Sequence, residues 1–251
     1  MKQAMIFAAG LGTRLKPLTD TMPKALVPIG GKPLLEIVLR HLKNAGFEHV
    51  IINIHHFAEH ILRFLDVNDM FGMDIHISYE KEQLLETGGG IKYAAKLFDG
   101  SSPILIHNVD ILNNVDLNDF YDRGEFVDAL LLVSERKTKR YLLFDEKMNL
   151  VGWTNIETGD VKSPFGEIKD LPIEELKQQF RLYAFSGIHV FSPSMFPLMV
   201  DYPDRFGIID FYLNECKHAN IKGWVKNDLR LIDVGKLDSL QEAEKFITNN
   251  I

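Results

Sequence analysis

Residues 6–28 read IFAAGLGTRLKPLTDTMPKALVP, and the interpretation of the chain begins with this stretch. The apolar run over residues 4–9 carries no charge, which is typical of a fully buried strand. Gly10 and Gly12 follow, where the backbone can turn sharply and its amides can be approached closely. Successive N–H groups in such a turn form a concave nest for anions. Because Arg14 and Lys24 add positive charge, the stretch predicts a polyphosphate-binding loop.

Two familiar phosphate-binding motifs do not fit this stretch. A Walker A loop needs Gly-Lys-Ser/Thr after four spacer residues, and none is present. The dinucleotide fingerprint needs a small residue three places after its second glycine, where this chain has Leu15. A strand that ends in Gly-x-Gly can also be only a tight turn, so the glycines by themselves leave a purely structural explanation open.

Length and composition favour one enzyme-sized domain. The chain has 251 residues, of which 46% are hydrophobic, and no Pro/Gly/Ser-rich linker divides residues 1–251. Its net charge of −7 argues against a general nucleic-acid binder. No apolar run approaches the roughly 20 residues that cross a bilayer, and the amino terminus shows no cleavable hydrophobic segment. We therefore expect a cytoplasmic protein without nucleic-acid or membrane partners; the sequence does not indicate its oligomeric state.

Strand and helix patterns alternate after the loop. Apolar residues recur at helical spacing over residues 34–45, and β-branched residues fill 50–54. A strand, a helix and a second strand imply a parallel pair with a right-handed crossover. Further strands are expected at 75–79, 103–107, 129–133, 141–144, 150–153, 182–191 and 231–235, helices at 61–65, 86–97, 209–218 and 237–247, and a loop or lid at 155–180. The pattern predicts an α/β fold with a mostly parallel central sheet in three layers.

Acidic residues and a glycine cluster stand at the ends of predicted strands. Asp110 follows the strand over residues 103–107, and Asp233 lies near the end of 231–235. Ligands of open α/β sheets bind at the carboxyl ends of strands, although either acid could be a turn former or a helix cap. Residues 86–90 read ETGGG, which indicates close approach of another group or, alternatively, a flexible loop.

Histidines follow the strand over residues 50–54. His56 and His60 are four residues apart, which is a spacing seen in metal sites. No cysteine or third clustered ligand accompanies them, so a solvated loop and helix start is the alternative that the sequence favours.

The string A-A-G-x-G-T-R-L-x-P-L-T, followed by P-K-A-L-V-P, resembles the signature of the sugar-1-phosphate nucleotidyltransferases. The resemblance covers nearly the whole chain and implies a Rossmann-like, GT-A type fold. It implies a nucleotide-binding half over residues 1–115 and a sugar-phosphate-binding half over 116–251. The implied reaction joins an NTP and a sugar-1-phosphate with Mg²⁺ as cofactor, releasing pyrophosphate. The chain most resembles short bacterial N-acetylmuramate-1-phosphate uridylyltransferases, which favours UTP. It also resembles mannose-1-phosphate guanylyltransferases and glucose-1-phosphate thymidylyltransferases, which makes GTP and dTTP the alternatives.

The resemblance also assigns roles to individual residues. Arg14 and Lys24 are expected to be catalytic, and Asp110 and Asp233 to hold Mg²⁺. The expected nucleotide-binding residues are Ala8, Ala9, Gly10, Gly12, Thr13, Gln83, Thr87 and Gly88. The expected sugar-phosphate residues are Gly187 and Asn155.

The chain departs from the family pattern at several positions. Val109 stands where the family usually has glycine before the metal-binding Asp, and Leu231 and Lys236 replace a Trp and a Thr around Asp233. The Glu-Lys-Pro element that many relatives use for the sugar phosphate is missing; Lys162 or Lys169 are candidates to replace its lysine. Because of these departures, the sequence does not identify the sugar of the sugar-1-phosphate substrate.

Two other functions fit parts of the pattern. One is a regulatory protein that binds a nucleotide sugar without turnover; it would not need both metal-binding acids. The other is a metal-dependent glycosyltransferase of related architecture, which would not need the Arg14 and Lys24 pair. An assay of pyrophosphate release from an NTP and a sugar-1-phosphate distinguishes the transferase, which releases it, from the regulatory protein, which does not.

Overall fold

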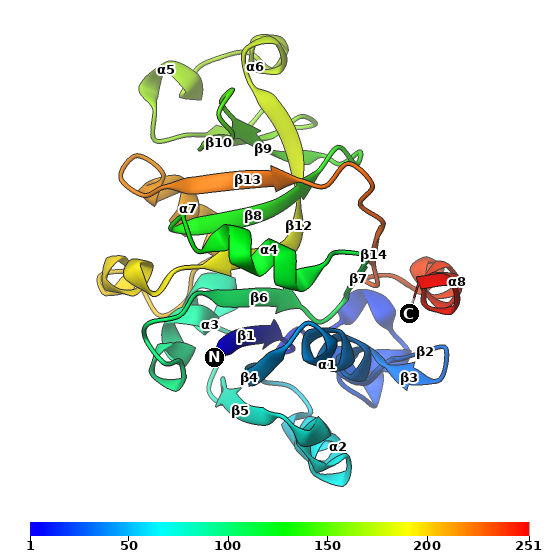
Figure 1. Cartoon of the computed structure of the whole chain (residues 1–251). Helices are drawn as coiled ribbons and strands as arrows, with labels where there is room; N and C mark the ends of the chain where they lie inside the picture. Colours follow the sequence, from blue (N-terminus) through cyan, green and yellow to red (C-terminus); the bar gives the residue numbers. More distant parts are fainter. Residues whose placement is uncertain (251) are drawn as a thin grey trace.

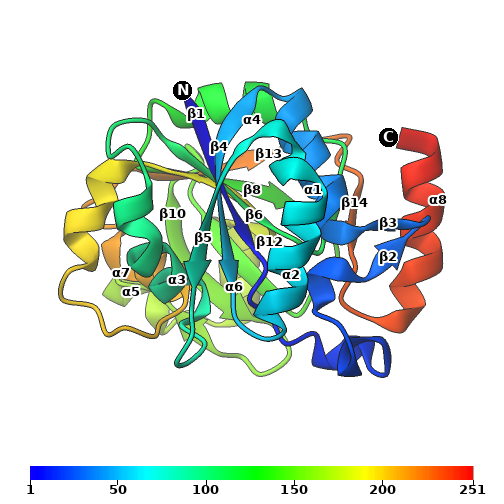
Figure 2. The same cartoon turned by 90° about the horizontal axis from the view of Figure 1, so that it is seen from below.

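The computed structural model describes residues 1–250, and a ten-stranded sheet runs through it with helices on both faces (Figures 1 and 2). The main strand order is β11-β10-β9-β12-β6-β1-β4-β5, and β8 pairs with both β12 and β13. The strands are β1 (Lys2–Phe7), β4 (Phe47–Ile54), β5 (Asp74–Tyr79), β6 (Ile104–Asn108), β8 (Ala129–Ser134), β9 (Arg140–Phe144), β10 (Leu150–Asn155), β11 (Val161–Lys162), β12 (Arg181–Phe191) and β13 (Ile221–Val225).

The first half of the chain forms the parallel part of this sheet. Strand β1 pairs in parallel with β4 and β6, and β4 pairs in parallel with β5. The crossovers are α1 (Leu34–Asn44), α2 (Ala58–Val67) and α3 (Glu86–Ala94). Gly46 follows α1 with φ +83°, the left-handed conformation that ends many helices. The predicted strand–helix–strand unit is therefore confirmed.

Strand β12 connects the two halves of the sheet. Its residues 188–191 pair antiparallel with β6, and residues 181–183 pair antiparallel with β9. The second half is mainly antiparallel, because β9, β10 and β11 form a meander. The exception is β13, which lies parallel to β8. The α/β, Rossmann-like fold class predicted from the sequence is confirmed, with its parallel strands gathered beside the predicted phosphate loop.

Two hydrophobic cores lie on opposite faces of the sheet. Alternation along β1 places Ala4 and Ile6 in one core and Met5 in the other. The first core includes residues of α1, α2, α4 (Leu117–Gly124) and α8 (Leu240–Asn250). The second includes residues of α3 and α7 (Ile208–Glu215). Within residues 1–250 no helix combines the length and the hydrophobicity needed to cross a membrane.

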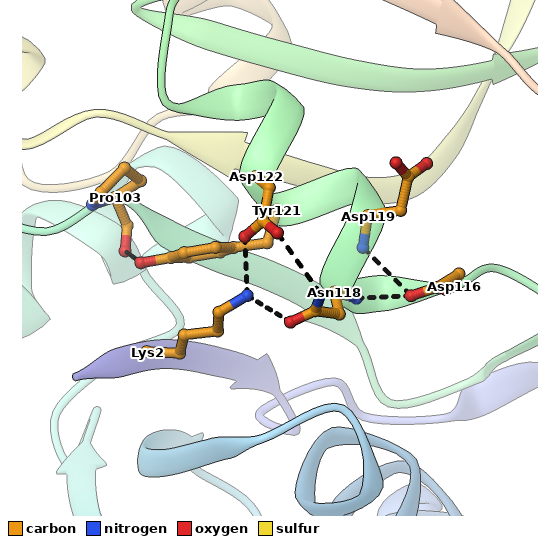
Figure 3. A network of polar contacts seen from close by, with 7 residues as sticks. All are labelled: Lys2, Pro103, Asp116, Asn118, Asp119, Tyr121 and Asp122. Carbon is orange, nitrogen blue, oxygen red and sulfur yellow. Dashed lines mark hydrogen bonds and ion pairs between the residues drawn. The ribbon is translucent and has the colours of Figure 1, made fainter.

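Helix α4 begins after Asp116, which caps its amino terminus. The Asp116 side chain accepts hydrogen bonds from the backbone N–H groups of Asn118 and Asp119 (Figure 3). On the same helix, the Asp122 carboxylate lies 2.7 Å from Lys2 Nζ on β1 (Figure 3). Asp116 therefore caps a helix, although like Asp110 it is an acid in the segment between β6 and α4.

The structure differs from the sequence-based expectation in three segments. Residues 155–180, expected as a loop, contain β11 and two short helices, α5 (Gly166–Lys169) and α6 (Ile173–Gln179). These elements bury few apolar side chains, so periodicity does not reveal them. The sequence analysis also missed β13 and the three-residue strand β7 (Ile111–Asn113), which pairs with β14 (Leu231–Asp233).

Candidate active site

The loop after β1 presents its backbone to an open space. Ala8 and Ala9 are buried, and the Ala8 N–H donates to Asn53 Oδ1 at 2.8 Å. Gly10 is exposed, and a Cβ placed on it would meet no atom within 4 Å. A ligand can therefore approach the backbone at Gly10 closely, as a phosphate-binding turn requires.

Gly12 folds the loop back onto the segment that carries Lys24. Its φ of +64° is a left-handed conformation that side chains disfavour. An added Cβ would lie 2.8 Å from Thr19 Cγ2 and 3.0 Å from Lys24 Cβ, and the Thr19 hydroxyl donates to the Gly12 carbonyl at 2.8 Å. Gly12 therefore sets the distance between the loop and Lys24.

A cavity of about 310 Å³ opens at this loop, and we call it the loop cavity. It lies at the carboxyl ends of the parallel strands, where open α/β sheets bind ligands. Its walls are Phe7, Ala8, Ala9, Gly10, Lys24, Asn53, Glu80, Leu84, Glu86, Thr87, Asn108, Val109, Asp110 and Arg205. Six of the residues predicted from the sequence are in this set: Ala8, Ala9, Gly10, Lys24, Thr87 and Asp110.

Lys24 and Asp110 form an ion pair in the wall of the loop cavity. Their side chains are 12% and 18% exposed, so the pair is largely shielded from solvent while it still borders the cavity. Each member of the pair can release its partner and bind instead a ligand group that carries the partner's charge. A phosphate oxygen would replace the carboxylate at Lys24, and a cation would replace the ammonium at Asp110.

Asp233 and Arg14 lie beside this pair. The Val234 N–H donates to the Asp110 carbonyl at 2.8 Å, and Asp233 pairs with Ile111, the residue after Asp110. A Cβ built on Gly235 would lie 2.7 Å from Asp233 Oδ1 and 2.8 Å from Arg14 Nη2. The structure thus places Asp233 opposite the residue after Asp110 and Arg14 beside Asp233, although neither Arg14 nor Asp233 lines the loop cavity.

The glycines of α3 have a structural role in this arrangement. The backbone N–H groups of Gly88 and Gly89 donate to the Phe206 carbonyl, and a Cβ on Gly88 would lie 2.4 Å from the Phe206 ring. Thr87 reaches the loop cavity, whereas Gly88 is buried beneath Phe206. Gln83 lines a separate cavity of about 630 Å³ on the outer side of α3. The assignments of Gly88 and Gln83 to nucleotide binding stay predictions.

A second cavity, of about 490 Å³, lies against the β9–β10 hairpin, and we call it the hairpin cavity. Its walls are Arg136, Thr138, Arg140, Tyr141, Leu142, Trp153, Lys162, Phe185, Ile209, Asp210 and Leu213. The two cavities are neighbours across the start of α7. Thr87 of the loop cavity accepts a hydrogen bond from the Ile208 N–H, and Ile209 lines the hairpin cavity.

Neither of the predicted sugar-phosphate residues lines the loop cavity or the hairpin cavity. Gly187 has φ +74°, and a Cβ there would lie 2.7 Å from Asn108 Nδ2, so this glycine permits close packing beside the loop cavity. Asn155 ends β10, where its Oδ1 accepts from the Glu157 N–H at 3.1 Å. Of the two candidate lysines, Lys162 lines the hairpin cavity, whereas Lys169 lies on α5.

Comparison with known proteins places the chain in a family. The family model described as nucleotidyl transferase matches residues 3–141. The chain belongs to the nucleotidyl transferase family. Because the match spans more than half of the sequence and includes β1, the glycine loop and Asp110, it covers most of the loop cavity.

Individual nucleotidyltransferases are similar over the full length. An N-acetylmuramate alpha-1-phosphate uridylyltransferase of Neisseria meningitidis is 30% identical over 96% of both chains. A D-glycero-alpha-D-manno-heptose 1-phosphate guanylyltransferase of Campylobacter jejuni is 37% identical over 99% of this chain and all of its own. A uridylyltransferase of Caulobacter vibrioides is 45% identical, but over only 43% of this chain and 46% of its own length. The crystal structure of HddC from Yersinia pseudotuberculosis has the same fold, with a TM-score of 0.76 at 23% identity over 98% of this chain.

Two residues that line the loop cavity were not predicted from the sequence. Asn53 Nδ2 donates to Glu80 Oε1 at 2.7 Å, and Glu80 Oε2 accepts from the Leu85 N–H at 2.9 Å. Asn53 also holds Ala8, so this buried network ties the phosphate loop to the segment before α3. Both residues stand at the carboxyl end of a predicted strand, the criterion that identified Asp110.

In the part of the chain that the structure describes, no third metal-ligating side chain converges with His56 and His60 after β4. The Phe57 ring lies beside both of them, with ring centroids 4.0 Å from His56 and 5.2 Å from His60. Among the described residues, the group of three metal-ligating side chains that converges is a different one, His49, Asp74 and His76.

Proposed function

We propose that this nucleotidyltransferase transfers a nucleoside monophosphate from an NTP to a sugar-1-phosphate, giving an NDP-sugar and pyrophosphate. The observation that carries the proposal is the Lys24–Asp110 pair in the wall of the loop cavity, beside the open backbone at Gly10. The names of the full-length relatives, which describe uridylyl and guanylyl transfer to sugar 1-phosphates, support the same reaction.

The loop cavity is the proposed site of the NTP. The amides of residues 10–14 and the Arg14 guanidinium would hold the β- and γ-phosphates, with Lys24 on the α-phosphate. A sugar phosphate oxygen then attacks the α-phosphorus, and pyrophosphate leaves on the opposite side. Because the nucleophile is already an anion, no general base is needed, and the main task is to offset the repulsion between two anions.

Asp110 and Asp233 are the proposed Mg²⁺ ligands. Both offer carboxylate oxygens, the ligands that Mg²⁺ prefers, and the Val234–Asp110 hydrogen bond holds their backbones side by side. Two carboxylates together with substrate phosphates are a common Mg²⁺ environment, so the residues present fit the ion. When bound, Mg²⁺ supplies positive charge at the transferring phosphoryl group.

The hairpin cavity is the proposed site of the sugar-1-phosphate. Arg136, Arg140 and Lys162 supply positive charge there, and Trp153 supplies an apolar wall for a sugar ring. Residues 1–115 would then bind the nucleotide, and residues 116–251 would bind most of the acceptor. We propose UTP as the first nucleotide to test, with GTP and dTTP as its competitors, because full-length relatives include a uridylyltransferase and a guanylyltransferase.

Pyrophosphate release with Mg²⁺ tests the proposal directly. Four NTPs are each combined with a panel of sugar-1-phosphates that includes N-acetylmuramate, heptose, mannose and glucose derivatives. Release that requires both substrates is expected for at least one combination. If the protein binds an NDP-sugar but releases no pyrophosphate with any pair, it is the regulatory binder and the proposed reaction is wrong.

A further inference from the structure

A second cluster of metal-ligating side chains lies at the amino-terminal ends of β4 and β5. His49 and Asp74 are direct partners in this parallel pair, and His76 lies two residues beyond Asp74. Residues two apart in a strand project from the same face, so Asp74 and His76 share the face on which His49 meets them. One ligand atom from each of the three side chains lies within 4.8 Å of the others.

The Asp74 carboxylate joins the two imidazole rings. His49 Nδ1 lies 2.6 Å from Asp74 Oδ2, and His76 Nε2 lies 2.9 Å from Asp74 Oδ1. The His49 side chain is only 10% exposed, whereas those of Asp74 and His76 are 56% and 46% exposed. The cluster therefore has one fixed, buried ligand and two ligands at the surface, with a side open to an ion from solvent.

The hydrogen bond on the far side of His49 makes this geometry informative. His49 Nε2 lies 2.9 Å from the Leu97 carbonyl oxygen, and because a carbonyl only accepts, Nε2 carries a proton. In the neutral ring Nδ1 then has a lone pair, and it faces a carboxylate oxygen at 2.6 Å. A metal ion bound by both atoms would hold them about 3 Å apart, because each bond to Zn²⁺ is about 2.0 Å long, so binding requires a small shift of the exposed Asp74 side chain.

We propose that His49, Asp74 and His76 bind a divalent transition-metal ion, with Zn²⁺ as the ion to test. Two imidazole nitrogens and a carboxylate are ligands suited to Zn²⁺, whereas Mg²⁺ prefers an all-oxygen set. The Leu97 carbonyl is the outer partner that orients the His49 ring and leaves Nδ1 for the metal, as commonly seen for metal-bound histidines. Water completes the coordination on the exposed side.

This site is separate from the proposed reaction. His49 stands near the start of β4, and Asn53 of the loop cavity stands four residues further along the strand, roughly 13 Å away. Strand β5 is the edge of the sheet, so an ion shared between β4 and β5 would fasten the edge strand to its neighbour. We therefore assign the site a stabilising role, independent of whether sugar-phosphate transfer is correct.

The test is a Zn²⁺ titration by calorimetry of the full chain without a histidine tag, in the presence of excess Mg²⁺ to occupy the acids of the loop cavity. One Zn²⁺ per chain is expected, with a melting temperature that rises with Zn²⁺ concentration. His76→Gln removes an exposed ligand and is expected to weaken Zn²⁺ binding by at least about 10-fold. His218→Gln, which removes an exposed histidine elsewhere, is the matched control and should leave binding unchanged.

Co²⁺ gives an independent readout, because visible absorption reports coordination by nitrogen ligands. The spectrum expected for the unmodified chain should be lost in His76→Gln and in Asp74→Asn, with circular dichroism to confirm that both variants are folded. Equal Zn²⁺ affinity in His76→Gln and His218→Gln would overturn the proposal. The absence of saturable Zn²⁺ binding would also overturn it.

Discussion

The loop cavity and the hairpin cavity are both lined by cations, but they hold those cations in different ways. In the loop cavity Lys24 is 12% exposed, paired with Asp110 and positioned by the packing of Gly12. In the hairpin cavity Arg140 and Lys162 are exposed, and Lys162 pairs with Asp210 in solvent at 2.7 Å. Charges in a shielded site act more strongly than charges exposed to water. A charge in the loop cavity therefore acts more strongly on a bound ligand than a charge in the hairpin cavity does.

The polar groups beneath the two regions differ as well. Under the loop cavity, Asn53 and Glu80 are buried and hydrogen-bonded, and His107 on β6 has partners at both ring nitrogens. On β12 and α7, by contrast, His189 has no partner at either nitrogen, and the Tyr212 hydroxyl has none. Satisfied buried networks fix geometry, whereas unpaired buried groups cost stability.

The largest expected effect tests the charges of the loop cavity. Asp110→Ala should reduce turnover by at least about 100-fold, the scale of losing preorganised charge stabilisation, while the protein stays folded. Steady-state pyrophosphate release and a thermal melt measure the two quantities. Asp116→Ala is the control: it removes the α4 cap and about 1 kcal/mol of stability but should leave turnover nearly intact. Equal turnover in the two variants would remove Asp110 from the active site.

The next effect tests the network that positions the phosphate loop. Glu80→Gln turns one acceptor into an NH₂ group that must face Asn53 Nδ2 or the Leu85 N–H. We expect a loss of about 1–3 kcal/mol in unfolding free energy and about a 10-fold fall in kcat. Urea denaturation and initial rates provide the measurements. A stability loss without any fall in kcat would show that the network supports the fold only.

A smaller effect is expected in the hairpin cavity. Arg140→Gln should raise the KM for the sugar-1-phosphate about fivefold, because an exposed charge contributes about 1 kcal/mol, and leave the KM for the NTP unchanged. Lys139→Gln is the control. It also removes one positive charge, but from the adjacent residue, whose ammonium pairs with Glu157 outside the hairpin cavity. If both variants behave alike, the acceptor does not bind in the hairpin cavity.

The effect that is smallest at neutral pH, and grows only in acid, concerns the unpaired histidine of β12. Burial lowers the pKa of His189 to about 3, well below the ordinary value of 6.5. Between these values the unfolded state binds more protons, so stability falls as pH drops from about 6.5 towards 3, by roughly 1–2 kcal/mol at pH 5. His189→Phe, which keeps a ring against Tyr212, should flatten this slope in unfolding experiments at several pH values. Burial also lowers the pKa of His107 to about 3, so His107 should still make stability depend on pH in the His189→Phe variant.

The sequence predicted the loop cavity far better than the hairpin cavity. A contiguous motif determines Gly10, Gly12 and Lys24, and the strand-end position of Asp110 is readable from β-branched periodicity. The hairpin cavity is assembled from β8–β9, β10, β12 and α7, and its arginines lie in a charge-rich connection that looks like a solvated turn. Its strand residues are brought together by antiparallel pairing among β9, β10, β11 and β12, and no local pattern encodes that register.

The continuous strand β12 has a consequence for how this protein can change its substrate. One end of the strand is hydrogen-bonded to β6 beside the loop cavity, and the other end to the β9–β10 hairpin. A single covalent segment therefore fixes the distance between the loop cavity and the hairpin cavity. If the hairpin cavity binds the acceptor as proposed, substitutions within residues 136–162 would change the choice of acceptor without changing that distance.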